Sequence, residues 1–162
     1  MVNITAAAKA AVAVYAAAVH LGGNDSIPLS DVAAAMAQLY LPGFTSFTLG
    51  SITALGANPA GGIATQLTSY NQSGIGTDFQ LCRSRIEPVS DESAIVWLTW
   101  AISPRNNLTR WKFTDVYGFR IADNRPDGLE GGWEWSNADD EYLKLFAHDP
   151  TFPTKRWLQP GE

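Results

Sequence analysis

The chain has 162 residues, of which 46% are apolar and 17% are charged, which is typical of one globular domain and excludes a disordered chain. Its net charge of −5, without a basic stripe, argues against a nucleic-acid partner, because phosphates require lysine and arginine. The single cysteine, Cys82, excludes an internal disulfide and favours a cytoplasmic location, and the distant His20 and His148 exclude zinc-type spacing.

The first predicted element is a helix over residues 5–20. Its apolar residues recur at steps of three and four, as one buried stripe does: Ile4, Ala8, Val12, Tyr15 and Val19. The alternative is a secretory leader, but Lys9 lies inside the segment and no basic region precedes it. The segment is also shorter than the ~20 apolar residues of a membrane span. We therefore expect a helix of the folded domain and no membrane partner.

The rest of the first half is predicted to contain two more helices and one strand. Residues 31–40 form the second helix, which ends at Tyr40, and residues 44–50 alternate as a strand does. Residues 60–70 form a short third helix, which Gly61 and Gly62 weaken. Residues 1–75 are therefore a mostly helical half with one strand.

The second half changes to strand patterns. Residues 78–90, 93–103, 110–122 and 133–137 alternate or are apolar on both faces, and turn-forming links join them. Residues 138–147 then form a closing helix with acids in its first turn, and residues 148–162 form an irregular tail that Trp157 is placed to dock. Helices followed by closely linked strands predict one α+β domain over residues 1–162, with N-terminal helices packed on a curved antiparallel sheet at 77–137.

The end of the chain carries the most specific pattern. The strand "FTDVYGFRIAD" precedes the turn Asp127-Gly128, and the strand "GWEWSNADDEY" runs into the closing helix. Together with the element order, this pattern resembles the nuclear-transport-factor-2-like superfamily, in particular its SnoaL-like branch. The resemblance implies a cone-shaped α+β barrel with one deep pocket, no cofactor, and a homodimer formed through the outer face of the sheet. Members of this superfamily include isomerases, cyclases, dehydratases and epoxide hydrolases, but also domains that only bind.

None of the catalytic patterns of this superfamily transfers intact. Tyr15 matches the tyrosine in the first helix of steroid isomerases, but their two acids have no match here. The Arg-x-Asp pair of limonene-type epoxide hydrolases is absent from residues 112–115, and Asn137 stands where their last acid stands. Scytalone-type dehydratases use a pair of pocket histidines, whereas His20 and His148 fall outside the predicted strands. The candidate residues therefore come from the alternation of the strands.

Asp115 is the first candidate for catalysis. It alternates along residues 111–121 with aromatic residues that we expect to face the helices: Trp111, Phe113, Tyr117 and Phe119. A carboxylate among them loses hydration, so its pKa rises toward neutral, as general acid–base catalysis requires. The alternative is a structural ion pair with Arg83 or Arg85. Tyr117 is the second candidate, either as a donor to a developing oxyanion or as an ordinary core tyrosine.

The last strand and the helices supply further candidates. We place Trp133, Trp135 and Asn137 inward, where Asn137 would hold a ligand oxygen, and Glu134 outward. A bulge at Gly131-Gly132 would instead turn Glu134 into the pocket as another catalytic acid. Trp97 and Trp100 fall on opposite faces of their strand, so that one of them lines the pocket. The remaining binding candidates are Trp97 and two tyrosines expected on helices at the pocket mouth, Tyr15 and Tyr40.

These features together predict a cofactor-free enzyme, without a metal site, that isomerises, cyclises or dehydrates a hydrophobic small molecule. Secondary metabolism is the setting that the resemblance suggests. The pocket should have a volume of roughly 300–1,000 Å³. The main alternative is a non-catalytic domain that binds a ligand or dimerises, which predicts no titratable group in the pocket. A hydrolase that activates a water molecule is the weaker alternative.

Overall fold

The computed structural model describes residues 1–152. Of the predicted irregular tail at 148–162, His148 instead ends a helix, and residues 153–162, with Trp157, lie outside the described residues. This part of the chain contains four α-helices: α1 Ile4–His20, α2 Leu29–Ala37, α3 Pro59–Gln72 and α4 Asp139–His148. It also contains six strands: β1 Tyr40–Thr48, β2 Ser51–Ala54, β3 Phe79–Pro88, β4 Ser93–Ile102, β5 Trp111–Ile121 and β6 Gly131–Asn137.

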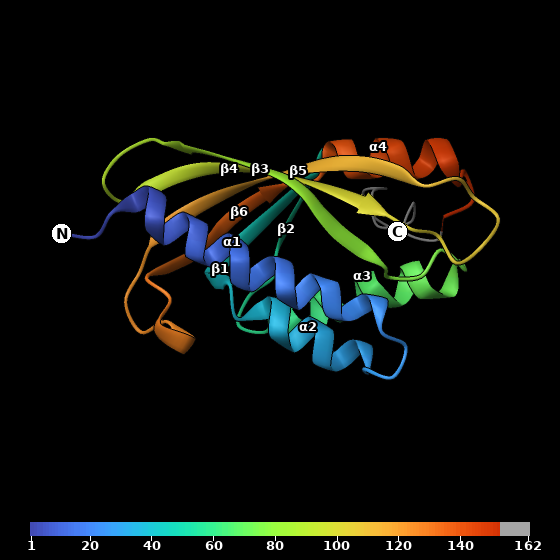
Figure 1. Ribbon diagram of the computed structural model, residues 1–162, viewed down its shortest axis with the longest axis horizontal. Helices are drawn as coiled ribbons and strands as arrows, with labels where there is room; N and C mark the ends of the chain where they lie inside the picture. The colour runs from blue at the N-terminus through green and yellow to red at the C-terminus, as the bar shows by residue number, and fades with distance from the viewer. Residues whose placement is uncertain (153–162) are drawn as a thin grey trace.

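The six strands form one sheet in the order β2-β1-β6-β5-β4-β3. Figure 1 shows α1, α2 and α3 together on one side of this sheet, whereas α4 lies beside β5. The predicted α+β class is thereby confirmed. The sheet is mixed and not antiparallel throughout, because β1 pairs with β6 in parallel. A parallel pair needs a long crossover, and here α3 and the strands β2 to β5 separate β1 from β6.

Helix α1 provides most of the helical cover of the sheet. Asn3 caps it by accepting a hydrogen bond from the Ala6 amide at 3.0 Å. Its buried residues form one face: Ala7, Ala8, Ala11, Val12, Tyr15, Ala18 and Val19. Among the described residues, the segment Ile4–Gly23 is the one helical stretch that is long and apolar enough to cross a membrane. The burial of its alanine and valine face is equally typical of a core helix.

The segment after α2 differs from the prediction. Tyr40 begins β1 instead of ending a helix, and β2 was not predicted. A two-residue turn joins these strands, and Leu49 and Gly50 both have positive φ angles there, 47° and 87°. Two positive angles match the twist of a tight hairpin, although leucine is an uncommon residue in this conformation. The hairpin ends the sheet on one side and forms one wall of the pocket described below.

A β-bulge in β6 decides which side chains of the last strand point inward. Gly118 lies opposite Trp135, and Phe119 lies opposite Trp133, so Glu134 is the extra residue between two pairs. Trp133 is therefore fully buried in the core, whereas Glu134 and Trp135 both face outward.

The bulge corrects the predicted inward position of Trp135, keeps Glu134 outward and brings Trp135 against Gly118. The Trp135 indole lies across Gly118, where a Cβ atom would be 2.1 Å from its Nε1 atom. Glu134 forms an outward ion pair with Arg120 at 2.5 Å, so it does not reach the pocket as a catalytic acid. The predicted bulge at Gly131-Gly132 does not turn Glu134 inward. These two glycines instead let the backbone carbonyls of Arg120 and Leu39 approach closely.

The variant Gly118→Ala tests this packing. Its methyl group would collide with the indole of Trp135, so we expect a loss of about 1–3 kcal/mol in the free energy of unfolding, measured by urea denaturation. In a Trp135→Ala background the same substitution should cost little, because the collision is gone. An equal loss in both backgrounds would contradict this packing of Trp135 on Gly118.

Candidate active site

A pocket of about 210 Å³ lies between the inner face of the sheet and the helices. Nine aromatic side chains line it: Tyr15, Tyr40, Phe44, Tyr70, Phe79, Trp100, Phe113, Tyr117 and Tyr142. The β1–β2 hairpin adds four hydroxyl groups: Ser46, Thr48, Ser51 and Thr53. The volume lies below the predicted range of roughly 300–1,000 Å³, so the pocket suits a compact ligand.

Asp115 reaches this pocket from β5, as predicted. Its side chain is 6% exposed, and its Oδ1 atom has no hydrogen-bond partner among the described residues. Burial raises the pKa of Asp115 well above its usual value, and the negative charge of Glu141 raises it further. The alternative ion pairs do not form, because Arg83 is exposed and Arg85 lies over Trp97.

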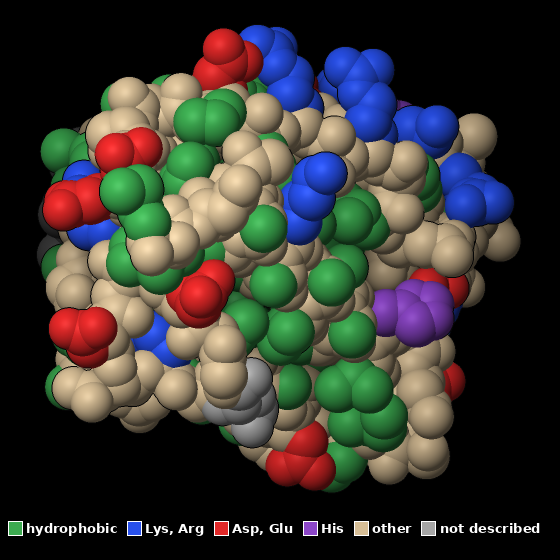
Figure 2. Space-filling view, turned by 60° about the vertical axis from the view of Figure 1, so that its left-hand side comes forward, with side chains coloured by type: hydrophobic (Ala, Val, Ile, Leu, Met, Phe, Trp, Pro, Cys, Tyr) green, Lys and Arg blue, Asp and Glu red, His purple; other side chains and the backbone are tan. Residues whose placement is uncertain are grey.

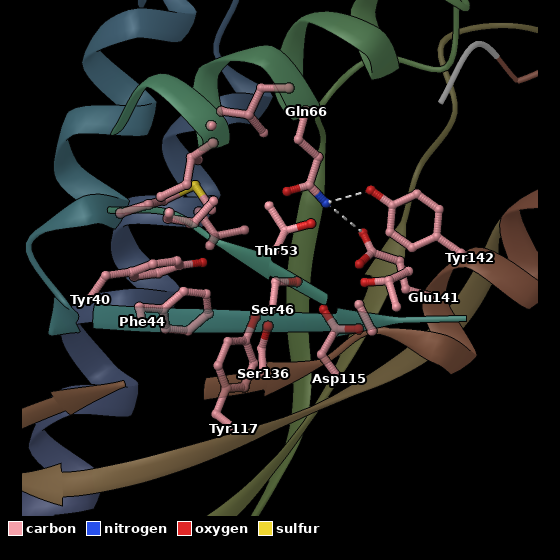
Figure 3. A pocket seen from close by; sticks show the side chains of 18 of the residues that line it. Tyr40, Phe44, Ser46, Thr53, Gln66, Asp115, Tyr117, Ser136, Glu141 and Tyr142 are labelled. Carbon is pink, nitrogen blue, oxygen red and sulfur yellow. Dashed lines mark hydrogen bonds between the residues drawn. The ribbon is translucent and has the colours of Figure 1, made fainter. Parts of the chain in front are cut away.

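Glu141 is a second buried acid in the pocket, and it was not predicted. It belongs to the first turn of α4, is 5% exposed, and accepts a hydrogen bond from the Tyr70 hydroxyl at 2.8 Å. Gln66 donates to the same Oε1 atom at 3.5 Å (Figure 3). Burial raises the pKa of Glu141 to about 7, although hydrogen bonds from Tyr70 and Asp115 oppose the rise. The two carboxyl groups thus interact with each other, and burial raises the pKa of both.

The acids that precede Glu141 fix its helix against the pocket. The Asp139 Oδ1 atom accepts a hydrogen bond from the Leu49 amide at 2.6 Å, which ties α4 to the β1–β2 turn. The Asp140 Oδ2 atom accepts one from the Thr114 amide at 2.8 Å, next to Asp115 in β5. The run of acids therefore does more than complement the helix dipole, because it holds Glu141 opposite Asp115.

Three tyrosine hydroxyls form a chain that leads to the acids. The Tyr15 hydroxyl lies 2.9 Å from that of Tyr40 and 3.1 Å from that of Tyr117. A hydrogen bond from Tyr117 lowers the pKa of Asp115 and partly offsets the effect of burial. Burial raises the pKa of all three phenols above the usual value for tyrosine, so they remain protonated donors at neutral pH.

Five of the predicted site residues come together in the pocket: Tyr15, Tyr40, Phe113, Asp115 and Tyr117. Three predicted binding residues are buried in the core without lining it. Trp111 stacks on His148, with ring centroids 4.3 Å apart, and Phe119 packs against Trp133.

The other predicted positions lie outside the pocket. Trp97 faces outward beneath Arg85, and Trp100 lines the pocket instead. Asn137 also misses the pocket, because the bulge places Ser136 there and leaves Asn137 to accept a hydrogen bond from the Asp139 amide at 3.0 Å. Sequence alternation alone could not show that Ser136 and not Asn137 lines the pocket, because one extra residue in a strand reverses the inward or outward direction of every later side chain.

Comparison with known proteins found similar solved structures. No protein-family model and no curated protein matches its sequence. An NTF-2-like protein of unknown function from Shewanella oneidensis shares 13% identity, with a TM-score of 0.59 and coverage of 82% of this chain and 96% of that one. A ketosteroid isomerase-like protein from Erwinia carotovora atroseptica shares 12% identity (TM-score 0.57, coverage 82% and 92%). A candidate scytalone dehydratase from Novosphingobium aromaticivorans shares 11% identity (TM-score 0.55, coverage 82% of this chain and 80% of that one). This chain therefore has the nuclear-transport-factor-2-like fold.

Proposed function

We propose that this protein is a cofactor-free enzyme that moves protons on a compact hydrophobic molecule. Reactions of this class include isomerisation, cyclisation and dehydration. The observation that carries the proposal is the buried pair of carboxyl groups, Asp115 and Glu141, in the wall of an aromatic pocket. Two acids whose surroundings separate their pKa values supply an acid and a base at the same pH.

The direction of the pKa shifts assigns the two roles. We assign Asp115 the role of general acid, because burial and the charge of Glu141 both raise its pKa and favour its protonated form. Glu141, with a pKa of about 7, is ionised in about half of the molecules at neutral pH and acts as the general base. The tyrosine chain ends beside Asp115 and can donate a hydrogen bond to an oxygen of the substrate.

A dehydration illustrates how the pair would work. Asp115 gives its proton to a hydroxyl oxygen of the substrate, and the C–O bond breaks as its electron pair leaves with water. Glu141 takes a proton from the adjacent carbon, and the electron pair of that C–H bond forms the C=C bond. The proton then returns from Glu141 to Asp115 across their direct contact, which restores the starting state. An isomerisation uses the same two groups, with the proton returned to a different carbon.

The composition of the pocket favours catalysis over simple binding. A pocket for passive binding needs no titratable group, and buried carboxyl groups without cations are costly to keep. Structural ion pairing does not explain Asp115, because no arginine or lysine of residues 1–152 lines the pocket. Buried carboxyl groups with raised pKa values and no cationic partner are typical of functional sites.

Proton exchange tests the proposal without knowledge of the natural substrate. Cyclic ketones such as cyclohexanone should exchange their α-protons for deuterium faster when the protein is added in D2O, as followed by proton NMR. The variants Asp115→Asn and Glu141→Gln should each lower the added rate by about 10²–10⁴-fold, the usual contribution of general acid–base catalysis.

Glu134→Gln is the matched control, because it removes a carboxylate that points away from the pocket. It should leave the exchange rate unchanged. Unchanged rates in both pocket variants, with their circular dichroism spectra intact, would contradict the assigned roles.

The pocket acids should also make stability depend on pH. The folded-state pKa of Glu141, about 7, lies above its ordinary value of 4.5, so the folded state holds a proton that the unfolded state releases. Stability is therefore complete below about pH 4.5 for this group and falls as the pH rises through 7, by on the order of 3 kcal/mol.

Urea denaturation of the wild type, Glu141→Gln and Glu134→Gln from pH 5 to pH 8 measures this dependence. The wild type and Glu134→Gln should lose stability over this range, and Glu141→Gln should lose distinctly less. A stability that rises toward pH 8 in the wild type, with the same slope in Glu141→Gln, would show that Glu141 ionises normally.

A further inference from the structure

The pocket contains acids but no cationic side chain from the described residues. Figure 2 shows Lys and Arg side chains at the surface, gathered toward one edge of this face. Every Lys and Arg of residues 1–152 is exposed except Arg125, which is half-buried and donates to the Gln38 carbonyl. His20 is exposed, and His148 stacks on Trp111 outside the pocket. Asp115 and Glu141 therefore have no counter-charge in this part of the chain.

Several acids at the surface of the protein differ from this pair because they form ion pairs. Four exposed or half-exposed carboxylates have basic partners: Asp25 with Arg105, Glu87 with Arg85, Glu134 with Arg120, and Asp140 with Lys144. The two acids that are most buried have only hydroxyl, amide and carboxyl partners. The positive end of α4 supplies a partial charge, but three acids of its first turn share it. Buried charges are normally paired, and residues 1–152 supply no cation to this pair.

We propose that the pocket binds a compact organic ammonium ion, a ring that carries a protonated amine, with the nitrogen against Asp115 and Glu141. The inference rests on the same pocket as the proposed function and names its substrate class.

The position of the acids within the pocket supports this class of ligand. Figure 3 shows the carboxyl groups of Asp115 and Glu141 turned toward the same space, whereas Tyr40 and Phe44 lie at the other end. An ammonium group has three donors, and the unpartnered Oδ1 atom of Asp115 lacks one. Tyr40 and Phe44 pack with ring centroids 4.3 Å apart and provide a surface for the apolar ring of the ligand.

The aromatic wall strengthens the preference for a cation. The faces of tyrosine, phenylalanine and tryptophan attract positive charge, and the attraction is larger where water is excluded. An anionic ligand meets the opposite situation, because it would lie beside the carboxyl pair with no donor of positive charge in the described wall. A neutral ligand gains the apolar contact but leaves the charge of the pair uncompensated.

Binding should be coupled to ionisation of the pair. The pair gains protons as the pH falls through 7, since the pKa of Glu141 is about 7 and burial also raises the pKa of Asp115 above its usual value. An ammonium ion favours the anion, so the complex releases a proton below pH 7 and little above it. The other titratable groups that face the pair are the phenols of Tyr70, Tyr117 and Tyr142, whose pKa values burial raises, and Asp140, which pairs with Lys144.

Three ligands of similar size distinguish a preference for a cationic, a neutral or an anionic ligand: benzylamine, benzyl alcohol and benzoate. Isothermal titration at about pH 8 should give benzylamine a Kd at least tenfold lower than that of benzyl alcohol, and no binding of benzoate. At about pH 6, benzylamine should bind roughly tenfold more weakly and release about one proton, which is measured by repeating the titration in buffers of different ionisation enthalpy. These measurements use the wild-type protein and do not depend on the folding of any variant.

The variants Glu141→Gln and Glu134→Gln provide the matched pair of charge removals, inside and outside the pocket. The first should abolish the preference for benzylamine, and the second should keep it. Equal Kd values for amine and alcohol in the wild type, a preference that survives Glu141→Gln, or displacement of benzylamine by calcium chloride alone would each overturn the proposal. Deuterium exchange into cyclic ketones without any amine preference would overturn this inference and leave the proposed function standing.

Discussion

The contact between the carboxyl groups of Asp115 and Glu141 is the constraint on which the site depends. Asp115 belongs to the strand β5 and Glu141 to the helix α4. Asp140 holds these two elements together, because its carboxylate accepts a hydrogen bond from the Thr114 amide. Helix α4 in turn is tied to the β1–β2 turn through Asp139. One short acidic run thus joins the closing helix, the central strand and the hairpin around a single buried pair.

The buried Asp115–Glu141 pair destabilises the folded state, but it provides the groups that can transfer protons. Two like charges in an apolar wall cannot both ionise, so one proton stays with the pair through neutral pH. The surrounding phenols have their own pKa values raised by burial and serve as donors without competing for that proton. The pocket therefore keeps one acid, one base and several neutral donors side by side, which ordinary surface carboxylates cannot do at the same pH.

Strand periodicity predicted much of this architecture. The alternation along residues 111–121 placed Asp115 and Tyr117 inward, because β5 is regular where those residues lie. The same rule failed in β6, because the bulge at Glu134 reverses the later residues, and the bulge is accompanied by a contact of Trp135 with Gly118 across strands. Periodicity within one strand contains no information about such a contact.

Glu141 could not be selected from the sequence for a different reason. It is one of three consecutive acids, Asp139 to Glu141, and all three suit a helix N-terminus equally well. Only the direction in which α4 docks distinguishes the residue that enters the pocket. Homodimer formation through the outer face of the sheet, a cytoplasmic location and a role in secondary metabolism stay predictions of the sequence and its resemblance.

The central claim is that one proton is held by the Asp115–Glu141 pair at neutral pH. Infrared difference spectroscopy detects it directly, because a protonated carboxyl group has a C=O stretching band that the carboxylate lacks. The account predicts such a band in the wild type at about pH 8, its loss in Asp115→Asn and its persistence in Glu134→Gln. The absence of any protonated carboxyl band above about pH 6 would contradict the account.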